Sequence, residues 1–210
     1  MLPKKVFIVS DYSAPVSYAR MFADHGWHVV PRMSPDVSLV QFIGGADVSP
    51  VIYGEKQITK TRVDETRDLN DAAYYAIAKR MGLKMAGICR GGQFLNVMCG
   101  GSMYQDVNGH ATGMSHNLMD LDTGEVVSVS STHHQMMIPG ATAEVVAVAD
   151  VSRTRTTDKG TVERSEGEDD IEVLFYKDEQ CLCFQPHPEF YNAQDTDKYY
   201  FRLLKKYFNL

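Results

Sequence analysis

The sequence predicts an α/β fold, a doubly wound and mostly parallel sheet with helices on both faces. Two observations carry this prediction. In the first half, short apolar runs closed by Gly, Pro or Asp alternate with segments of helical spacing, as in βαβ units. In the second half, apolar runs follow one another without a comparable helix between them, which predicts additional antiparallel strands at an edge of the sheet.

The apolar runs of the first half have the continuous character of parallel strands buried on both faces. We expect strands at VFIVS (6–10), HVV (28–30), VQFIG (40–44) and MAGIC (85–89), with helices over 14–25 and 67–81. The later strands are expected at EVVSVS (125–130), AEVVAVAD (143–150), IEVLFY (171–176) and CLCFQ (181–185). An amphipathic stretch over 192–208 should form a last helix that packs on the sheet.

Length and composition favour an ordinary globular chain. With 210 residues, 44% of them hydrophobic and 23% charged, we expect one domain spanning 1–210. The net charge of −6, without a stripe of Lys and Arg, disfavours nucleic acid as a partner. No apolar run reaches the length of a membrane span, so we expect a cytoplasmic protein with reduced cysteines. The charged segment 152–170 should be a solvated loop or hairpin.

Cys89 lies between an apolar run and a helix-like run, in the pattern G-x-C-x-G. This is the thiol form of the strand-turn-helix elbow, in which glycines allow the turn to pack closely against its neighbours. The turn would place the sulfur at the N-terminus of the following helix, where a thiolate is favoured. Most lone cysteines are small buried hydrophobes, but the elbow spacing favours a nucleophile here.

A base for this thiol is supplied by the segment QPHPE. His187 follows an apolar run and is held between two prolines, which restrict the backbone on both sides. Glu189 could accept the other ring N–H and set the tautomer, completing the order nucleophile, base and orienter. Without an elbow upstream, an ordinary loop histidine would be the better interpretation; with it, we predict a catalytic pair.

Acyl transfer also needs donors for the developing oxyanion. Gly44 and Gly45 follow an expected strand, where a Gly-Gly bend can aim a backbone N–H into the crevice at the carboxyl edge of the sheet. The partner donor would be the N–H of Arg90, directly after the thiol. Arg67 and Asp68 are expected to form a structural ion pair beneath the elbow.

The segments GICRGGQFLNVMCGGSMYQDV and QPHPE resemble the class I glutamine amidotransferases. GGADVSPVIYGE (44–55), TRD (66–68) and THHQ (132–135) are more specifically similar to the γ-glutamyl hydrolase branch, which includes γ-glutamyl-γ-aminobutyrate hydrolases. The likeness runs from about residue 40 to residue 190. The chain departs from the branch at Ser130-Ser131, where Asn-Ser is usual, and at Ile43, where proline is usual.

The resemblance implies a flavodoxin-like sheet and an amidohydrolase with Cys89, His187 and Glu189 as its triad. It further implies Gly45 and Arg90 as oxyanion donors. Three residues would contact the substrate: Gly44, Gln93 and His133. The implied reaction cleaves the γ-amide of glutamine or of a γ-glutamyl-amine through a thioester on the cysteine.

Three functions stay open at this stage. The chain could hydrolyse a γ-glutamyl-amine, supply ammonia from glutamine to a synthetase partner, or be a binding protein that keeps the fold without the reaction. In each case the ligand is a small molecule. The sequence does not decide whether the protein forms a homodimer. We expect no cofactor and no metal, because the spacing of His110, His116, His133 and His134 matches no common zinc motif.

Overall fold

The computed structural model describes residues 3–10, 15–161, 170–190 and 194–210. Its strands are β1 (Lys5–Val9), β2 (His28–Val30), β3 (Leu39–Phe42), β4 (Met85–Ile88), β5 (Ser102–Tyr104), β6 (Ala111–Asp120), β7 (Val126–Thr132), β8 (Met136–Ile138), β9 (Ala143–Ala149), β10 (Thr156–Thr157), β11 (Gly160–Thr161), β12 (Ile171–Tyr176) and β13 (Cys181–Phe184). Its helices are α1 (Val16–Asp24), the 3-10 helix η1 (Pro50–Tyr53), α2 (Glu65–Arg80), α3 (Arg90–Met98) and α4 (Gln194–Phe208).

Nine strands form one sheet in the order β2-β1-β3-β4-β13-β12-β9-β6-β7. The first five pair in parallel, and the pairings from β13 through β12, β9 and β6 to β7 are antiparallel. The predicted fold class is therefore confirmed, with a parallel core extended by antiparallel strands. The antiparallel part is wider than its apolar runs indicate, because it includes β6, whose sequence ATGMSHNLMD carries no strand signal.

Burial explains why the two halves have different sequences. Every residue of β3, β4 and β13 is buried, as continuous apolar runs in a covered parallel sheet must be. The edge strand β7 instead alternates buried and exposed residues in VVSVSST, because one of its faces meets solvent. The central strands therefore lie between helices, and their carboxyl ends meet at one edge.

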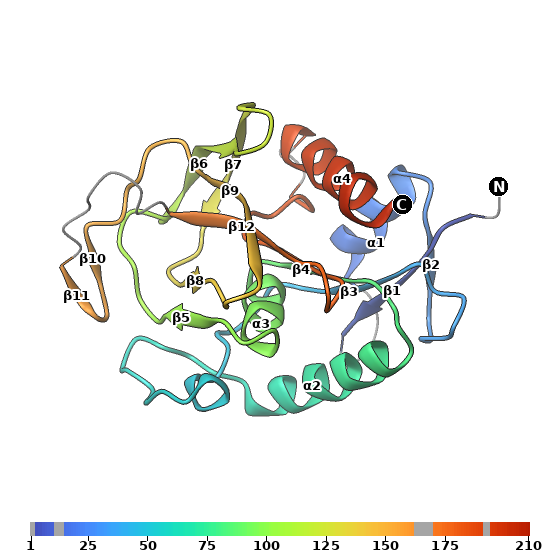
Figure 1. Cartoon of the computed structure of the whole chain (residues 1–210), viewed down its shortest axis with the longest axis horizontal. Coiled ribbons are helices and arrows are strands. Elements are labelled where there is room, and N and C mark those ends of the chain that lie inside the picture. Colours follow the sequence, from blue (N-terminus) through green and yellow to red (C-terminus); the bar gives the residue numbers. More distant parts are fainter. Residues whose placement is uncertain (1–2, 11–14, 162–169, 191–193) are drawn as a thin grey trace.

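Helices cover both faces of the parallel core, as Figure 1 shows with α4 and α1 on one side and α2 and α3 on the other. Residues that α4 buries against the sheet are Tyr199, Tyr200, Leu203, Leu204 and Phe208. Helix α2 begins at an N-cap, where the Asp64 side chain accepts a hydrogen bond from the N–H of Arg67 at 3.1 Å. The helix then ends on Lys79 and Arg80, whose charges complement its dipole.

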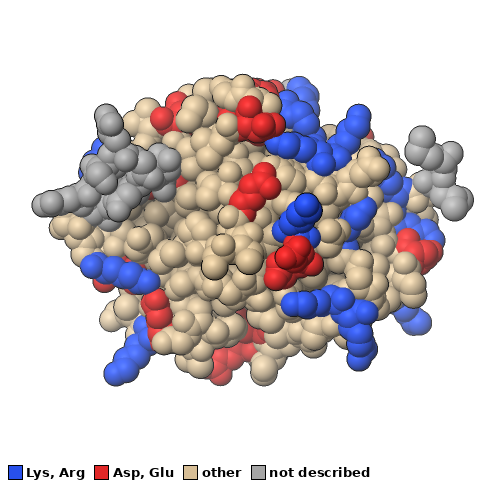
Figure 2. Space-filling view, viewed as in Figure 1, with Lys and Arg blue, Asp and Glu red and all other residues tan. Residues whose placement is uncertain are grey.

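Outside the main sheet, β10 and β11 form a short antiparallel hairpin within the segment expected to be a loop or hairpin. Residues 162–169 of that segment lie outside the described residues. Within the part of the chain that the structure describes, no helix is long and apolar enough to cross a membrane. Figure 2 shows one face of the molecule, where Lys and Arg side chains are interspersed with Asp and Glu.

Candidate active site

Cys89 occupies a strained turn between β4 and α3. Its backbone has φ 52° and ψ −116°, a conformation that L-residues rarely adopt. The strain is held by close packing on both sides of the turn. A Cβ on Gly87 would lie 2.2 Å from the carbonyl oxygen of Gly91, and one on Gly91 would lie 2.5 Å from the carbonyl oxygen of Phe42. The predicted elbow is therefore present, and its glycines are required by backbone contacts.

Replacing Gly87 with alanine is expected to destabilise the protein by at least about 3 kcal/mol, because the new methyl group would meet backbone atoms that cannot rotate away. Gly100→Ala is the control, since a Cβ there meets nothing within 4 Å and only its φ of 88° is unfavourable. That variant should lose about 1–2 kcal/mol. Urea unfolding of both variants checks this; equal losses would contradict the close packing.

His187 and Cys89 are brought to the same edge of the sheet by strand pairing. β13 runs parallel to β4 with Phe184 opposite Ile88, and the N–H of Cys89 donates to the carbonyl of Phe184 at 2.7 Å. Cys89 follows the last residue of β4 directly, and His187 comes three residues after the end of β13, so two residues far apart in sequence reach the same edge of the sheet. Nδ1 of His187 lies 2.6 Å from Oε1 of Glu189. This contact leaves Nε2 as the ring nitrogen available to a second partner.

Gly44 lies between the two side chains. It follows β3, the neighbour of β4 on the other side, and a Cβ at this position would lie 3.0 Å from Cε1 of His187 and 3.7 Å from Cβ of Cys89. Its own N–H donates to the hydroxyl of Tyr18 at 3.0 Å. The carboxyl ends of β3, β4 and β13 thus converge on one point, as expected for the crevice of an α/β sheet.

The electrostatics of His187 follow from this convergence. Burial lowers the pKa of His187, but hydrogen bonding to Cys89 and Glu189 and the charges of those two groups outweigh burial and raise it to about 10. Burial also raises the pKa of Tyr18, so its hydroxyl stays protonated beside Gly44. At neutral pH the pocket therefore holds a protonated imidazole.

The segment after Gly44 is fixed by Arg67. The guanidinium donates to the carbonyls of Ile43 at 3.0 Å and Gly44 at 3.3 Å, and a Cβ on Gly45 would lie 2.7 Å from its Nη1. Only glycine fits there, since Gly45 also has φ 153°. The N–H of Arg90 lies in the first turn of α3, where amides have no partner within the helix.

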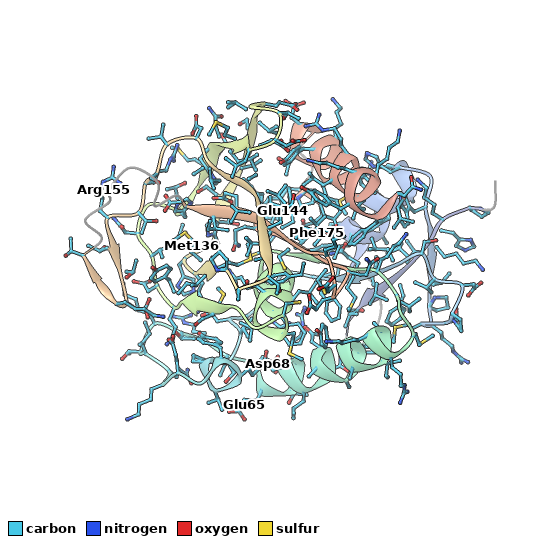
Figure 3. All side chains as sticks on the ribbon, in the orientation of Figure 1. Glu65, Asp68, Met136, Glu144, Arg155 and Phe175 are labelled. Carbon is cyan, nitrogen blue, oxygen red and sulfur yellow. The ribbon has the colours of Figure 1, made fainter. Side chains whose placement is uncertain are left out.

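The expected ion pair of Arg67 with Asp68 is not formed among the described residues, because each of the two side chains pairs with another partner. Arg67 pairs with Asp71 at 3.5 Å, whereas Asp68 binds the buried side chain of Arg90. Arg90 also binds Asp71, so its guanidinium bridges two carboxylates of α2. Consecutive residues of a helix do not face each other, so Arg67 and Asp68 point in different directions. Figure 3 shows Asp68 pointing from α2 toward the interior and Glu65, one turn earlier, pointing outward. The α2 face that meets α3 carries the acids.

The structure places the two remaining predicted substrate contacts in the interior. Gln93 is 3% exposed and donates through Nε2 to Oε1 of Gln185 at 3.0 Å. His133 is 4% exposed, and its Nδ1 lies 2.9 Å from the carbonyl oxygen of Gln135. Both side chains are therefore engaged within the protein, and their contact with a substrate stays a prediction.

An open cleft of about 600 Å³ adjoins the candidate site on the side of α1. Its described lining residues are Val16, Ser17, Arg20, Met21, Asp24, Pro188, Glu189, Phe190 and Asp197. Glu189 lines the cleft, whereas Cys89 is not among its described lining residues. Phe190, which also lines the cleft, stacks on the ring of His187 with centroids 4.5 Å apart.

A family model described as peptidase C26 matches residues 28–189, which include the elbow and the His-Pro-Glu segment. The chain belongs to the peptidase C26 family. This C26 member is 31% identical over 157 residues to the glutamine amidotransferase-like protein YvdE of Lactococcus lactis, covering 73% of this chain and 66% of the relative. It is 27% identical over 197 residues to a carbamoyl phosphate synthase small chain of Nitratidesulfovibrio vulgaris, covering 92% of this chain and 46% of the relative.

The aligned part of the C26 member spans less than two thirds of the length of these curated relatives. Solved structures agree on the fold. A Thermoplasma acidophilum protein described as part of a GMP synthase superposes with a TM-score of 0.62 at 14% identity, covering 98% of this chain and 99% of that one. A glutamine amidotransferase of Thermotoga maritima gives 0.58 at 13%, covering 97% and 84%. The family assignment supports an amide hydrolase or amidotransferase.

Two residues of this C26 member contribute to the site without having been predicted. Ser130 accepts a hydrogen bond from the N–H of His187 at 2.8 Å, and thereby ties the loop after β13 to β7. Tyr18 holds the N–H of Gly44 from α1. The only sequence signal for Ser130 was that it stands where Asn-Ser is usual. The amphipathic pattern around Tyr18 predicts a buried aromatic ring, and it does not indicate that the hydroxyl of this residue forms a hydrogen bond.

Proposed function

We propose that the protein is a cysteine amidohydrolase that cleaves the γ-amide of glutamine or of a γ-glutamyl-amine. The single observation that carries this proposal is the convergence of Cys89, His187 and Gly44 at the carboxyl ends of adjacent strands, with Glu189 bonded to the far side of the imidazole. A strained thiol beside a protonated, carboxylate-oriented imidazole is suited to nucleophilic acyl transfer. Membership of the C26 family supports the same class of reaction.

In the proposed reaction, Cys89 attacks the side-chain carbonyl carbon as a thiolate whose proton is already on His187, and the carbonyl electrons move to the oxygen. The N–H groups of Gly45 and Arg90 donate to that oxyanion. His187 gives its proton to the departing amine as the C–N bond breaks, which leaves a γ-glutamyl thioester. Water, deprotonated by His187, then attacks the thioester, and glutamate leaves with regeneration of the thiolate and the protonated imidazole.

Arg67 has a supporting part in this scheme. Its contacts with the carbonyls of Ile43 and Gly44 fix the peptide that precedes Gly45, and so aim the Gly45 N–H. The Gly44 N–H is bonded to Tyr18, which supports Gly45 as the oxyanion donor of this pair. We keep Gly44, Gln93 and His133 as proposed substrate-pocket residues, with Gly44 the one that adjoins the thiol.

The proposal is tested by measuring glutamate and amine release from a panel of glutamine, γ-glutamyl-γ-aminobutyrate and a γ-linked polyglutamate. Asparagine is the control for side-chain length, and the Cys89→Ala protein is the blank. We expect turnover of at least one γ-glutamyl amide and none of asparagine. No release from any member of the panel by folded protein would reject the hydrolase function.

A second candidate function is the supply of ammonia to a synthetase. It is favoured by the likeness to carbamoyl phosphate synthase small chains and by the similarity in fold to a chain in the PurLQS structure of Thermotoga maritima, with a TM-score of 0.55. This candidate predicts glutamine as the only substrate, with turnover that depends on the partner. Turnover of γ-glutamyl-γ-aminobutyrate by the isolated chain would exclude it.

The third candidate, a binding protein without turnover, is separated by labelling with a glutamine-like electrophile. A nucleophilic Cys89 should form an adduct that mass spectrometry places on the peptide containing this residue, while Cys181 and Cys183, which are buried, stay unmodified. The absence of an adduct in folded protein would favour the binding function.

The pH profile should show an alkaline limb set by His187. A raised pKa means that the imidazolium persists to higher pH, so kcat/KM should fall as the pH passes about 10 rather than near the ordinary value of 6.5. Glu189→Gln removes one of the groups that raise this pKa, and it should move the limb to lower pH. A limb that stays in place in Glu189→Gln would show that His187 does not set it.

A further inference from the structure

Four buried side chains form a second cluster next to the candidate site. His110 precedes β6, His116 lies on it, His133 follows β7, and Glu172 lies on β12. Their exposed fractions are 0%, 2%, 4% and 0%. We call these four residues the His-Glu cluster. They meet where β9, which separates β6 from β12, ends at Ala149. His116 lies two residues before Leu118, the β6 residue paired with Ala149, and Glu172 lies at an irregularity of the β12–β9 pairing between Ile171 and Val173.

One carboxylate oxygen is the centre of the His-Glu cluster. Oε1 of Glu172 lies 2.8 Å from Nε2 of His116, 3.5 Å from Nδ1 of His110 and 3.6 Å from Nε2 of His133. Only the first distance is that of a hydrogen bond. The other two nitrogens, and Oε2 of the glutamate, are buried without a hydrogen-bond partner among the described residues. Such orphaned polar atoms are costly in a protein interior and call for an explanation.

The outer contacts of the histidines determine which nitrogens carry lone pairs. Nε2 of His110 lies 2.9 Å from Oδ2 of Asp170, and Nδ1 of His133 lies 2.9 Å from the carbonyl oxygen of Gln135. A carboxylate and a carbonyl only accept, so each of these nitrogens is an N–H. In the neutral imidazoles, the opposite nitrogens therefore direct lone pairs at the oxygen of Glu172. Lone pairs that face a carboxylate repel it unless a cation lies between them.

We propose that the His-Glu cluster is a structural site for Zn²⁺ or a similar divalent transition-metal ion, held by His110, His116 and Glu172, whose ligand atoms all lie within 4.8 Å of one another. His133, with Nε2 at 3.6 Å from Oε1 of Glu172, would move closer to become the fourth ligand, and in that case it binds the ion rather than a substrate. Bonds of about 2.0–2.1 Å in a tetrahedron place ligand atoms about 3.4 Å apart, close to the two long separations in the cluster. Imidazole donors select this class of ion over Mg²⁺ and Ca²⁺, which prefer oxygen. An outer acceptor that orients a ligating ring is a regular feature of such centres. His110 and His133 each have one, whereas Nδ1 of His116 is buried without a hydrogen-bond partner among the described residues.

The ion would replace the proton that His116 and Glu172 share. In a neutral imidazole the displaced proton moves to Nδ1 of the same ring, which is buried without a hydrogen-bond partner among the described residues, so binding to the neutral ring releases no net proton. The site would join β6, β12 and the segment after β7. Ser130, which holds the backbone of His187, lies on that same strand β7. The four ligands come from three separate parts of the chain, which is why their sequence spacing matches no zinc motif.

The test uses the full chain with Cys89→Ala, because a thiol beside His187 could itself bind zinc. After expression in zinc-supplemented medium and dialysis against metal-free buffer, elemental analysis should find about one zinc per chain. His116→Gln and Glu172→Gln should remove it. His134→Gln is the matched control, since His134 follows His133 directly but pairs with Asp47 outside the cluster. That variant should keep the ion.

Thermal unfolding gives a second readout that does not need the variants to be fully stable. Zinc at about 100 times its Kd should raise Tm by about 5–10 °C in the Cys89→Ala protein and in its His134→Gln derivative. The shift should be absent in any folded variant of the cluster, with His133→Gln available if Glu172→Gln does not fold. Only trace zinc in folded Cys89→Ala protein, or equal zinc in the His116→Gln and His134→Gln variants, would overturn the site and leave the cluster as a protonated hydrogen-bond network.

Discussion

Replacing Cys89 with alanine is expected to lower kcat for the best γ-glutamyl substrate by at least about 10⁴-fold, because no thioester can form and the remaining groups of a triad act poorly alone. The fold should persist, since the thiol is only half-buried and its removal leaves the glycine contacts around the turn unchanged. The loss of kcat is measured as the rate of glutamate release from the substrates of the panel.

The matched control for this loss is Cys99→Ala. Cys99 is half-buried like Cys89 but caps the far end of α3, where its thiol contacts the core residue Cys181. We expect kcat to change less than about threefold. A Cys89→Ala protein that kept more than about 1% of the wild-type kcat would remove the thioester from the mechanism.

Replacing Arg90 with methionine is expected to lower the free energy of unfolding by about 3–5 kcal/mol. The Arg90 side chain is 1% exposed and binds Asp68 and Asp71, both of which are buried. Methionine fills a similar volume but leaves two carboxylates in the interior, of which Asp71 keeps its ion pair with Arg67. Urea unfolding measures the loss.

Arg202→Met is the control for this change. Arg202 forms a salt bridge with Glu125 in which both side chains remain about half exposed, at 49% and 44%. Solvent screens such a pair, so we expect a loss of about 0–1 kcal/mol. If the free energy of unfolding fell by a similar amount in the two variants, the buried salt bridges of Arg90 would contribute no more to stability than a surface salt bridge. Activity should also fall in Arg90→Met, because α3 carries the proposed oxyanion donor.

The parts of the site that are encoded locally could be predicted from the sequence. A glycine on each side of a cysteine specifies a sharp turn, and two prolines around a histidine restrict its backbone, so Cys89 and His187 are marked by their own neighbours. The parallel strands are equally clear, because burial on both faces requires a continuous apolar run. Their side-by-side arrangement then follows from parallel pairing.

Features that depend on distant partners could not be predicted. β6 is stabilised by β7 and β9 rather than by its own polar sequence, so nothing local marks it as a strand. The exchange of partners among Arg67, Asp71 and Arg90 depends on how α2 packs against α3. The His-Glu cluster combines residues from β6, β12 and the end of β7, and only the sheet order brings them together.

The position of β13 has a consequence for synthesis on the ribosome. This strand is the last to be made, yet it inserts between β4 and β12. Until it emerges, a nascent chain would hold two partial sheets, each with an open edge able to pair with another molecule. The thiol turn could form early, but its imidazole would arrive only when the final strand closes the gap, so an incomplete chain would lack the reactive pair.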